Sequence, residues 1–148
     1  MTSPPAGGDP GGVQTLEKLR RVLAESSFHR LLGLQLEACD SAAGTVVIRS
    51  SLQPQLERAP GSGQYHGGVI ASLIDIAGDF ALIAALGHGV PTINLRVDYL
   101  RPALNSDLVA RARVRKAGRT VGVVDVDVED QAGRLIAVGR GCYGTQPG

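Results

Sequence analysis

The sequence of 148 residues is poor in aromatic side chains, with no tryptophan, three tyrosines and two phenylalanines. Its two cysteines, Cys39 and Cys142, lie far apart and form no CxxC or metal-ligand spacing, so we expect neither a disulfide framework nor a metal site. The formal net charge is +1 with both signs spread evenly, which argues against a nucleic-acid or membrane-surface partner. The chain does not open with a basic segment followed by an apolar run, so we expect a cytoplasmic protein.

One apolar segment dominates the chain. From Val69 to Leu86 it contains no Lys, Arg or Glu, and its only charged residues are Asp75 and Asp79. The apolar residues follow a helical period and most of the remaining positions are also apolar, so the segment predicts a helix that is buried nearly all round. It is just long enough to span a membrane. The two aspartates near its middle instead favour the central helix of a soluble fold.

A polar stripe runs along this helix. Gly68, Ser72, Asp75 and Asp79 recur at helical spacing, and a carboxylate buried in an apolar helix is costly unless it is paired or used. The stripe must therefore face a pocket, a partner chain or water. A purely structural interpretation is also open, in which Ser72 and Asp79 bond each other or the backbone and Asp75 points to solvent.

His66, Gly67 and Gly68 stand where the helix is expected to begin. Glycines allow a ligand to approach the backbone closely, and the unpaired N–H groups of a first helical turn can hold an oxyanion. An ordinary tight turn would have the same composition.

The rest of the chain predicts one α+β domain over residues 13–148, preceded by a disordered tail over residues 1–12. Residues 13–34 show the pattern of an amphipathic helix that is interrupted at Ser26-Ser27. Two strands, over 34–38 and 44–52, are expected before the central helix. Three alternating segments follow it and predict an antiparallel sheet, on which arginines of one strand face acids of the next: Arg111, Arg113, Arg115, Asp125, Asp127 and Glu129.

Three motifs carry a resemblance to a known family. They are His66-Gly67-Gly68 with Asp75 nine residues after the histidine, the segment Tyr99-Leu100-Arg101-Pro102-Ala103, and Gly118-Arg119 followed by the hairpin at 130–137. From about residue 28 to 143 the chain resembles the hotdog-fold acyl-CoA thioesterases of the phenylacetate-type (PaaI-like) subfamily. The resemblance implies an antiparallel sheet wrapped around one long central helix, hydrolysis of acyl-CoA thioesters, and no cofactor apart from the CoA of the substrate.

The resemblance also implies roles for individual residues. Gly67 would offer its N–H to the thioester oxygen, Asp75 would act as nucleophile or general base, His66 would orient substrate or water, and Thr92 could hold the hydrolytic water. Thr92 could equally be a plain strand residue. The residues that would bind substrate and CoA are Gly68, Asn94, Tyr99, Leu100, Arg101, Pro102, Lys116 and Arg119, of which the three cations could equally be solvated surface.

Helix geometry adds a constraint. Gly67 and Asp75 are eight residues apart, roughly 12 Å along one helix, whereas reacting atoms meet at about 3–3.5 Å. Both groups can act on one thioester only if they come from two chains, which predicts at least a homodimer; the family resemblance extends this to a homotetramer.

The chain departs from the family pattern at Pro60, where many relatives carry an asparagine whose amide assists at the carbonyl. Gln64 or Arg58 would have to replace that amide. A hotdog protein that binds acyl-CoA or acyl-carrier protein without hydrolysing it therefore remains an alternative, and a dehydratase of the same fold is a more distant one. The acyl group, aliphatic or arylacetyl, stays open.

Overall fold

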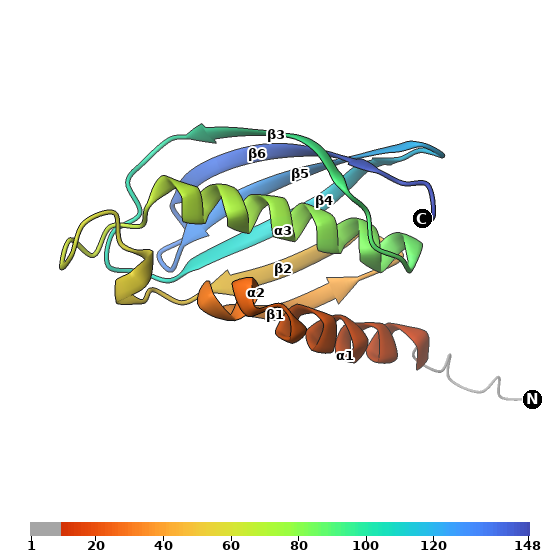
Figure 1. The fold of residues 1–148 in the computed structure, drawn as a ribbon, viewed down its shortest axis with the longest axis horizontal. Coiled ribbons are helices and arrows are strands. Elements are labelled where there is room, and N and C mark those ends of the chain that lie inside the picture. Colours follow the sequence, from red (N-terminus) through yellow and green to blue (C-terminus); the bar gives the residue numbers. More distant parts are fainter. Residues whose placement is uncertain (1–9) are drawn as a thin grey trace, which may run out of the picture.

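The computed structural model describes residues 10–148, with side chains from residue 16 onward. One antiparallel sheet of six strands, in the order β1-β2-β4-β5-β6-β3, curls around a single long helix (Figure 1). The elements along the chain are α1 (Pro10–Glu25), α2 (Ser27–Leu31), β1 (Leu34–Asp40), β2 (Thr45–Ser50), a short 3-10 helix η1 (Pro54–Leu56), α3 (Gly67–Leu86), β3 (Thr92–Tyr99), β4 (Leu108–Ala117), β5 (Val121–Asp130) and β6 (Leu135–Gly144).

The central helix α3 is the core of the domain, as the sequence predicts. Its inward residues are almost fully buried against the concave face of the sheet, among them Leu73, Ile74, Ala77, Phe80, Ala81 and Leu82. Gly87 ends the helix in the left-handed conformation, with a φ of 81°, and donates its N–H to Ile83. By length and composition α3 could cross a membrane, but the sheet wraps it and 56% of its most apolar window is buried, as in a core helix.

The sheet confirms the predicted strand alternation. Val124, Val126 and Val128 of β5 point into the core. On the outer face Arg111 lies opposite Asp127 and Arg113 opposite Asp125, which is the predicted pairing of arginines with acids. A hydrogen bond from Arg140 of β6 holds the pKa of Asp125 below its usual range. The charge run is therefore a solvated sheet face.

The N-terminal helices differ slightly from the prediction. Helix α1 begins at Pro10, so residues 10–12 of the predicted tail are helical; residues 1–9 lie outside the described chain. The break falls at Ser26, whose hydroxyl accepts the N–H of His29 and starts α2. Leu19 and Leu23 are buried, so α1 covers the outer edge of the domain along β1.

Candidate active site

The first residue of α3, Gly67, presents a free backbone N–H. His66 is the N-cap of the helix, and its ring nitrogen Nδ1 accepts the N–H of Gly68 at 2.9 Å. Among residues 10–148, the N–H of Gly67 has no hydrogen-bond partner. The predicted donor Gly67 is therefore free to bind an oxyanion, whereas the N–H of Gly68 is already engaged with His66.

The same contact fixes the tautomer of His66. A ring nitrogen that accepts a hydrogen bond carries no proton, so a neutral His66 carries its proton on Nε2. Any hydrogen bond from this ring to a ligand must be donated through Nε2, because Nδ1 is engaged with the helix.

A cavity of about 420 Å³ opens beside this helix start. The predicted segment Tyr99-Leu100-Arg101-Pro102 lines it together with His66 and Gly67, and the Tyr99 hydroxyl donates to the carbonyl of Gly67 at 2.7 Å. Pro60 is not among the lining residues, whereas Gln64 and Arg58 are. The two side chains that could replace the family amide thus line the same cavity as His66 and Gly67.

Asp75 sits two turns further along α3, on its half-exposed face. The hydroxyl of Thr92, the first residue of β3, donates to Asp75 Oδ1 at 2.8 Å. This contact joins two of the predicted site residues within one chain. Gly67 does not lie near this pair. It is eight residues before Asp75 on a regular helix, so the two residues are about 12 Å apart along the helix axis.

The remaining predicted residues lie apart from the cavity. Asn94 is exposed on β3. Lys116 and Arg119 lie at the β4–β5 hairpin, at the opposite end of the sheet from Gly67 (Figure 1). Within one chain these cations cannot belong to the site that Gly67 forms. The part of the chain from residue 10 onward holds no group of three or more His, Cys, Asp or Glu arranged for a metal ion.

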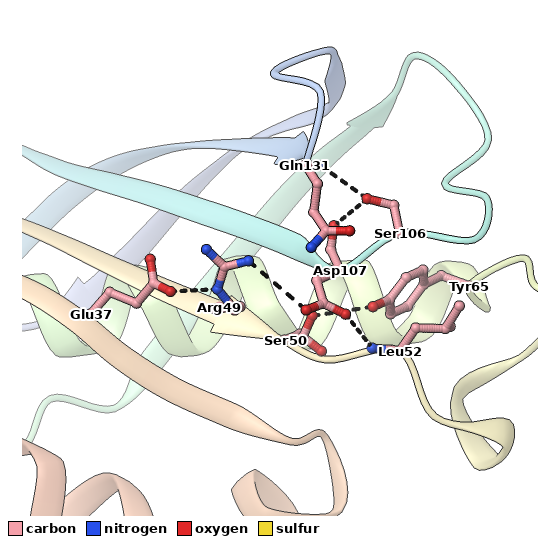
Figure 2. A network of polar contacts seen from close by, with 8 residues as sticks. All are labelled: Glu37, Arg49, Ser50, Leu52, Tyr65, Ser106, Asp107 and Gln131. Atoms are coloured by element: carbon pink, nitrogen blue, oxygen red, sulfur yellow. Dashed lines mark hydrogen bonds and ion pairs between the residues drawn. The ribbon is translucent and has the colours of Figure 1, made fainter.

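A polar network fastens the loop that leads into α3 (Figure 2). The buried Tyr65 donates its hydroxyl to the main-chain oxygen of Ser50 at 3.2 Å, and Asp107 accepts the N–H of Leu52 at 3.1 Å. Arg49 bridges the carboxylates of Glu37 and Asp107. Burial raises the pKa of Tyr65, which keeps its hydroxyl protonated as a donor. The network therefore fixes the residue immediately before His66.

Asp79 carries the one buried side-chain oxygen, Oδ1, that lacks a hydrogen-bond partner within the described chain. Burial, and then the negative charge of Asp75 one turn away, raise the pKa of Asp79 to about 7, and a hydrogen bond from the backbone N–H of Val90 opposes this only in part. Asp79 thus faces the α3–β3 connection, where Val90 lies.

We predict that Asp79→Asn stabilises the protein at pH 8 and not at pH 4. The folded state holds the Asp79 proton up to about pH 7, whereas an unfolded chain releases it near pH 4, so stability falls as pH rises between these values. The neutral variant should gain at most about 4 kcal/mol of unfolding free energy at pH 8. Urea unfolding at fixed protein concentration measures this. The exposed carboxylate variant Asp127→Asn is the control, and an equal gain at pH 4 would contradict the prediction.

Comparison with known proteins assigns the chain to a family. The sequence model of the thioesterase superfamily matches residues 63–137, which span the end of the loop before α3, the helix, β3 to β5 and the first residues of β6. The chain belongs to the thioesterase superfamily. This family assignment confirms the predicted hotdog fold and the expectation of a thioester hydrolase.

Individual relatives agree with the family assignment. A provisionally named esterase of Halobacterium salinarum is 40% identical over 123 residues, which cover 76% of this chain and 80% of the relative. Human acyl-coenzyme A thioesterase 13 is 31% identical over 133 residues, covering 86% of this chain and 92% of its own. The structure of Escherichia coli PaaI, a protein from the phenylacetic acid degradation operon, superposes with a TM-score of 0.80 at 24% identity, covering 93% and 96% of the two chains; this similarity concerns the fold.

Proposed function

We propose that the protein hydrolyses acyl-CoA thioesters to a free acid and CoA. The observation that carries this proposal is the pair of functional groups on α3: a free backbone N–H at Gly67 and the carboxylate of Asp75 held by Thr92. The name of the human relative, an acyl-coenzyme A thioesterase, supports CoA as the carrier. Acyl transfer needs an oxyanion donor and a nucleophile or base, and these groups supply both.

The catalytic unit in this proposal is a homodimer. Because Gly67 and Asp75 are about 12 Å apart along one helix, a single carbonyl can contact both only if one comes from each chain. A two-fold axis that places Gly67 of one chain beside Asp75 of the other must run the two α3 helices antiparallel, and it then creates two equivalent sites.

The edge of β3 supports this pairing. In the described chain β3 has a hydrogen-bonded neighbour, β6, on one side only. Its side chains are mostly exposed, including Ile93 at 59% and Tyr99 at 53%. A long strand edge without a neighbour is a ready surface for a second chain, and β3 also carries Thr92 beside Asp75. A homotetramer would be a pair of such dimers.

In the proposed reaction the Gly67 N–H stabilises the oxyanion that forms on the thioester oxygen. Asp75 of the facing chain attacks the carbonyl carbon, or removes a proton from a water that Thr92 holds. In the first route the C–S bond breaks as an acyl–aspartyl anhydride forms, the CoA thiolate takes a proton from solvent, and water then hydrolyses the anhydride to the free acid and the Asp75 carboxylate. In the second route the water oxygen adds to the carbonyl carbon, the C–S bond breaks, and the proton held by Asp75 passes to the CoA sulfur. His66 orients substrate or water through Nε2. Unlabelled acid after a single turnover in ¹⁸O-labelled water would identify Asp75 as the nucleophile, because a carboxylate oxygen of Asp75 reaches the product when water attacks the aspartyl carbon of the anhydride.

The cavity at the helix start would receive the arm of CoA. Tyr99, Leu100 and Pro102 would form its walls, and Arg101 and Arg58 would attract the phosphates. Gly68 follows the lining residue Gly67 and does not itself line the cavity. In an antiparallel dimer the far end of one α3 extends beyond the start of the other. Lys116, Arg119 and Asn94 lie far from Gly67 of their own chain. In the dimer they would therefore contribute to the site at Gly67 of the other chain.

The test is release of free thiol from a panel of aliphatic and arylacetyl CoA esters, with acyl-carrier-protein thioesters alongside. We expect turnover well above background for at least one CoA ester, and the rates will identify the acyl preference. Binding of acyl-CoA without thiol release would contradict the proposal and favour the non-catalytic alternative, for which the proline at position 60 is the supporting observation. Hydration of an enoyl-CoA would indicate the dehydratase.

A further inference from the structure

We propose that Tyr143 is a positioning residue for Asp75, and that it forms with Thr92 a pair of hydroxyls that holds this aspartate from two sides. The inference rests on the proposed hydrolysis, because it assigns a part in that reaction to a residue outside every motif. Tyr143 lies in β6, 68 positions after Asp75.

The first contact is to the main chain of the aspartate. The Tyr143 hydroxyl donates to the backbone oxygen of Asp75 at 2.9 Å. In a regular helix that oxygen also accepts the N–H four residues later, so Tyr143 adds a second bond at this turn of α3. Burial, reinforced by the charges of Asp75 and Asp79, raises the pKa of Tyr143, so its hydroxyl stays protonated and continues to donate.

The second contact comes from the residue opposite Tyr143 on the neighbouring strand. Thr92 of β3 pairs with Tyr143 of β6, and its hydroxyl donates to the Asp75 carboxylate at 2.8 Å. Two cross-strand partners thus hold the main chain and the side chain of the same residue. A carboxylate that must act within a few tenths of an ångström of a carbonyl carbon needs such support from rigid neighbours.

The space around Tyr143 is made by two glycines. A Cβ at Gly78 of α3 would lie 2.2 Å from the Tyr143 hydroxyl, and one at Gly141 of β6 would lie 2.4 Å from it. The ring itself is fully buried. Both α3 and β6 therefore have a glycine where the Tyr143 hydroxyl reaches Asp75, and any larger residue there would displace the hydroxyl.

The experiment compares Tyr143→Phe with wild type on the best CoA ester. The variant keeps the ring and loses only the hydroxyl, so we expect it to fold. Its kcat should fall about tenfold or more while KM stays within about twofold, because substrate binding does not use the buried ring. In an Asp75→Asn background the same change should leave the residual kcat unaltered, since Tyr143 acts through Asp75.

Ser50→Ala is the matched structural control. It removes another buried hydroxyl that donates to a main-chain oxygen, that of Leu32, at 2.8 Å, and it keeps the main-chain oxygen of Ser50 to which Tyr65 donates. We expect a comparable fall in melting temperature with unchanged kcat and KM. Wild-type kcat in Tyr143→Phe, or an equal further loss in the Asp75→Asn background, would overturn the inference. Absence of turnover in wild type would instead overturn the proposed function.

Discussion

Replacing Asp75 by asparagine is expected to lower kcat about 10³-fold, roughly 4 kcal/mol of transition-state stabilisation. The amide has the same shape and can still accept the hydrogen bond from Thr92, but it neither attacks a carbonyl carbon nor removes a proton from water. KM should change little. Steady-state thiol release measures both constants, and size-exclusion chromatography checks that the variant assembles as wild type does.

The control for this variant is Asp127→Asn, which neutralises an exposed carboxylate on the outer face of the sheet. We expect it to match wild type. Activity of Asp75→Asn within a few-fold of wild type would exclude Asp75 as nucleophile and as base while leaving the thioesterase assignment intact.

Replacing Gly67 by proline is expected to lower kcat by about 10²–10³-fold. Proline deletes the N–H that is proposed to hold the oxyanion. The helix should tolerate it, because Gly67 is the first residue of α3, where proline is favoured, and the extended conformation of His66 suits a residue before proline.

Gly67→Ala separates loss of the N–H from added bulk. It keeps the donor and adds only a Cβ, which would lie 3.4 Å from the Tyr99 ring, an approach that Tyr99, half exposed, can relieve. We expect a much smaller effect than for proline. Equal losses in the two variants would mean that crowding, and not the missing donor, causes the defect.

The two variants together test the shared site. In a co-expressed equal mixture, about half of the dimers contain one chain of each kind, and each of these has one site with both groups intact. The mixture should therefore recover about a quarter of wild-type activity, although each variant alone is nearly inactive. Failure to recover activity in mixed dimers would contradict a site that takes Gly67 from one chain and Asp75 from the other.

Local sequence patterns predicted the central helix and five of the six strands, whereas β6 was implied only by the hairpin of the family resemblance. The apolar run from Val69 to Leu86 has a helical period that no strand can use, and alternating arginines and acids defined β4 and β5. The short helix η1 was missed in a loop rich in proline and glycine, because three residues are too few to show a period. The break near Ser26 was visible because serine is a strong N-cap.

The site was only partly predictable, since its contacts depend on strand register. His66, Gly67 and Asp75 lie on one helix, so their spacing is fixed by the sequence. That Gly68 gives its N–H to His66 could not be inferred, because glycine beside histidine fits several turns. Tyr143 carries no motif; a pairing with Thr92 across 51 residues, visible only in the sheet, brings it to Asp75.

In the proposed dimer, the single-sided pairing of β3 would make the activity depend on protein concentration. If each site takes groups from two chains across this edge, an isolated chain has a complete fold and no complete site. Upon dilution below the dissociation constant of the dimer, the rate should fall with the square of the protein concentration, while the helical and sheet content stays the same. The chain would then be active only where enough of it accumulates to pair.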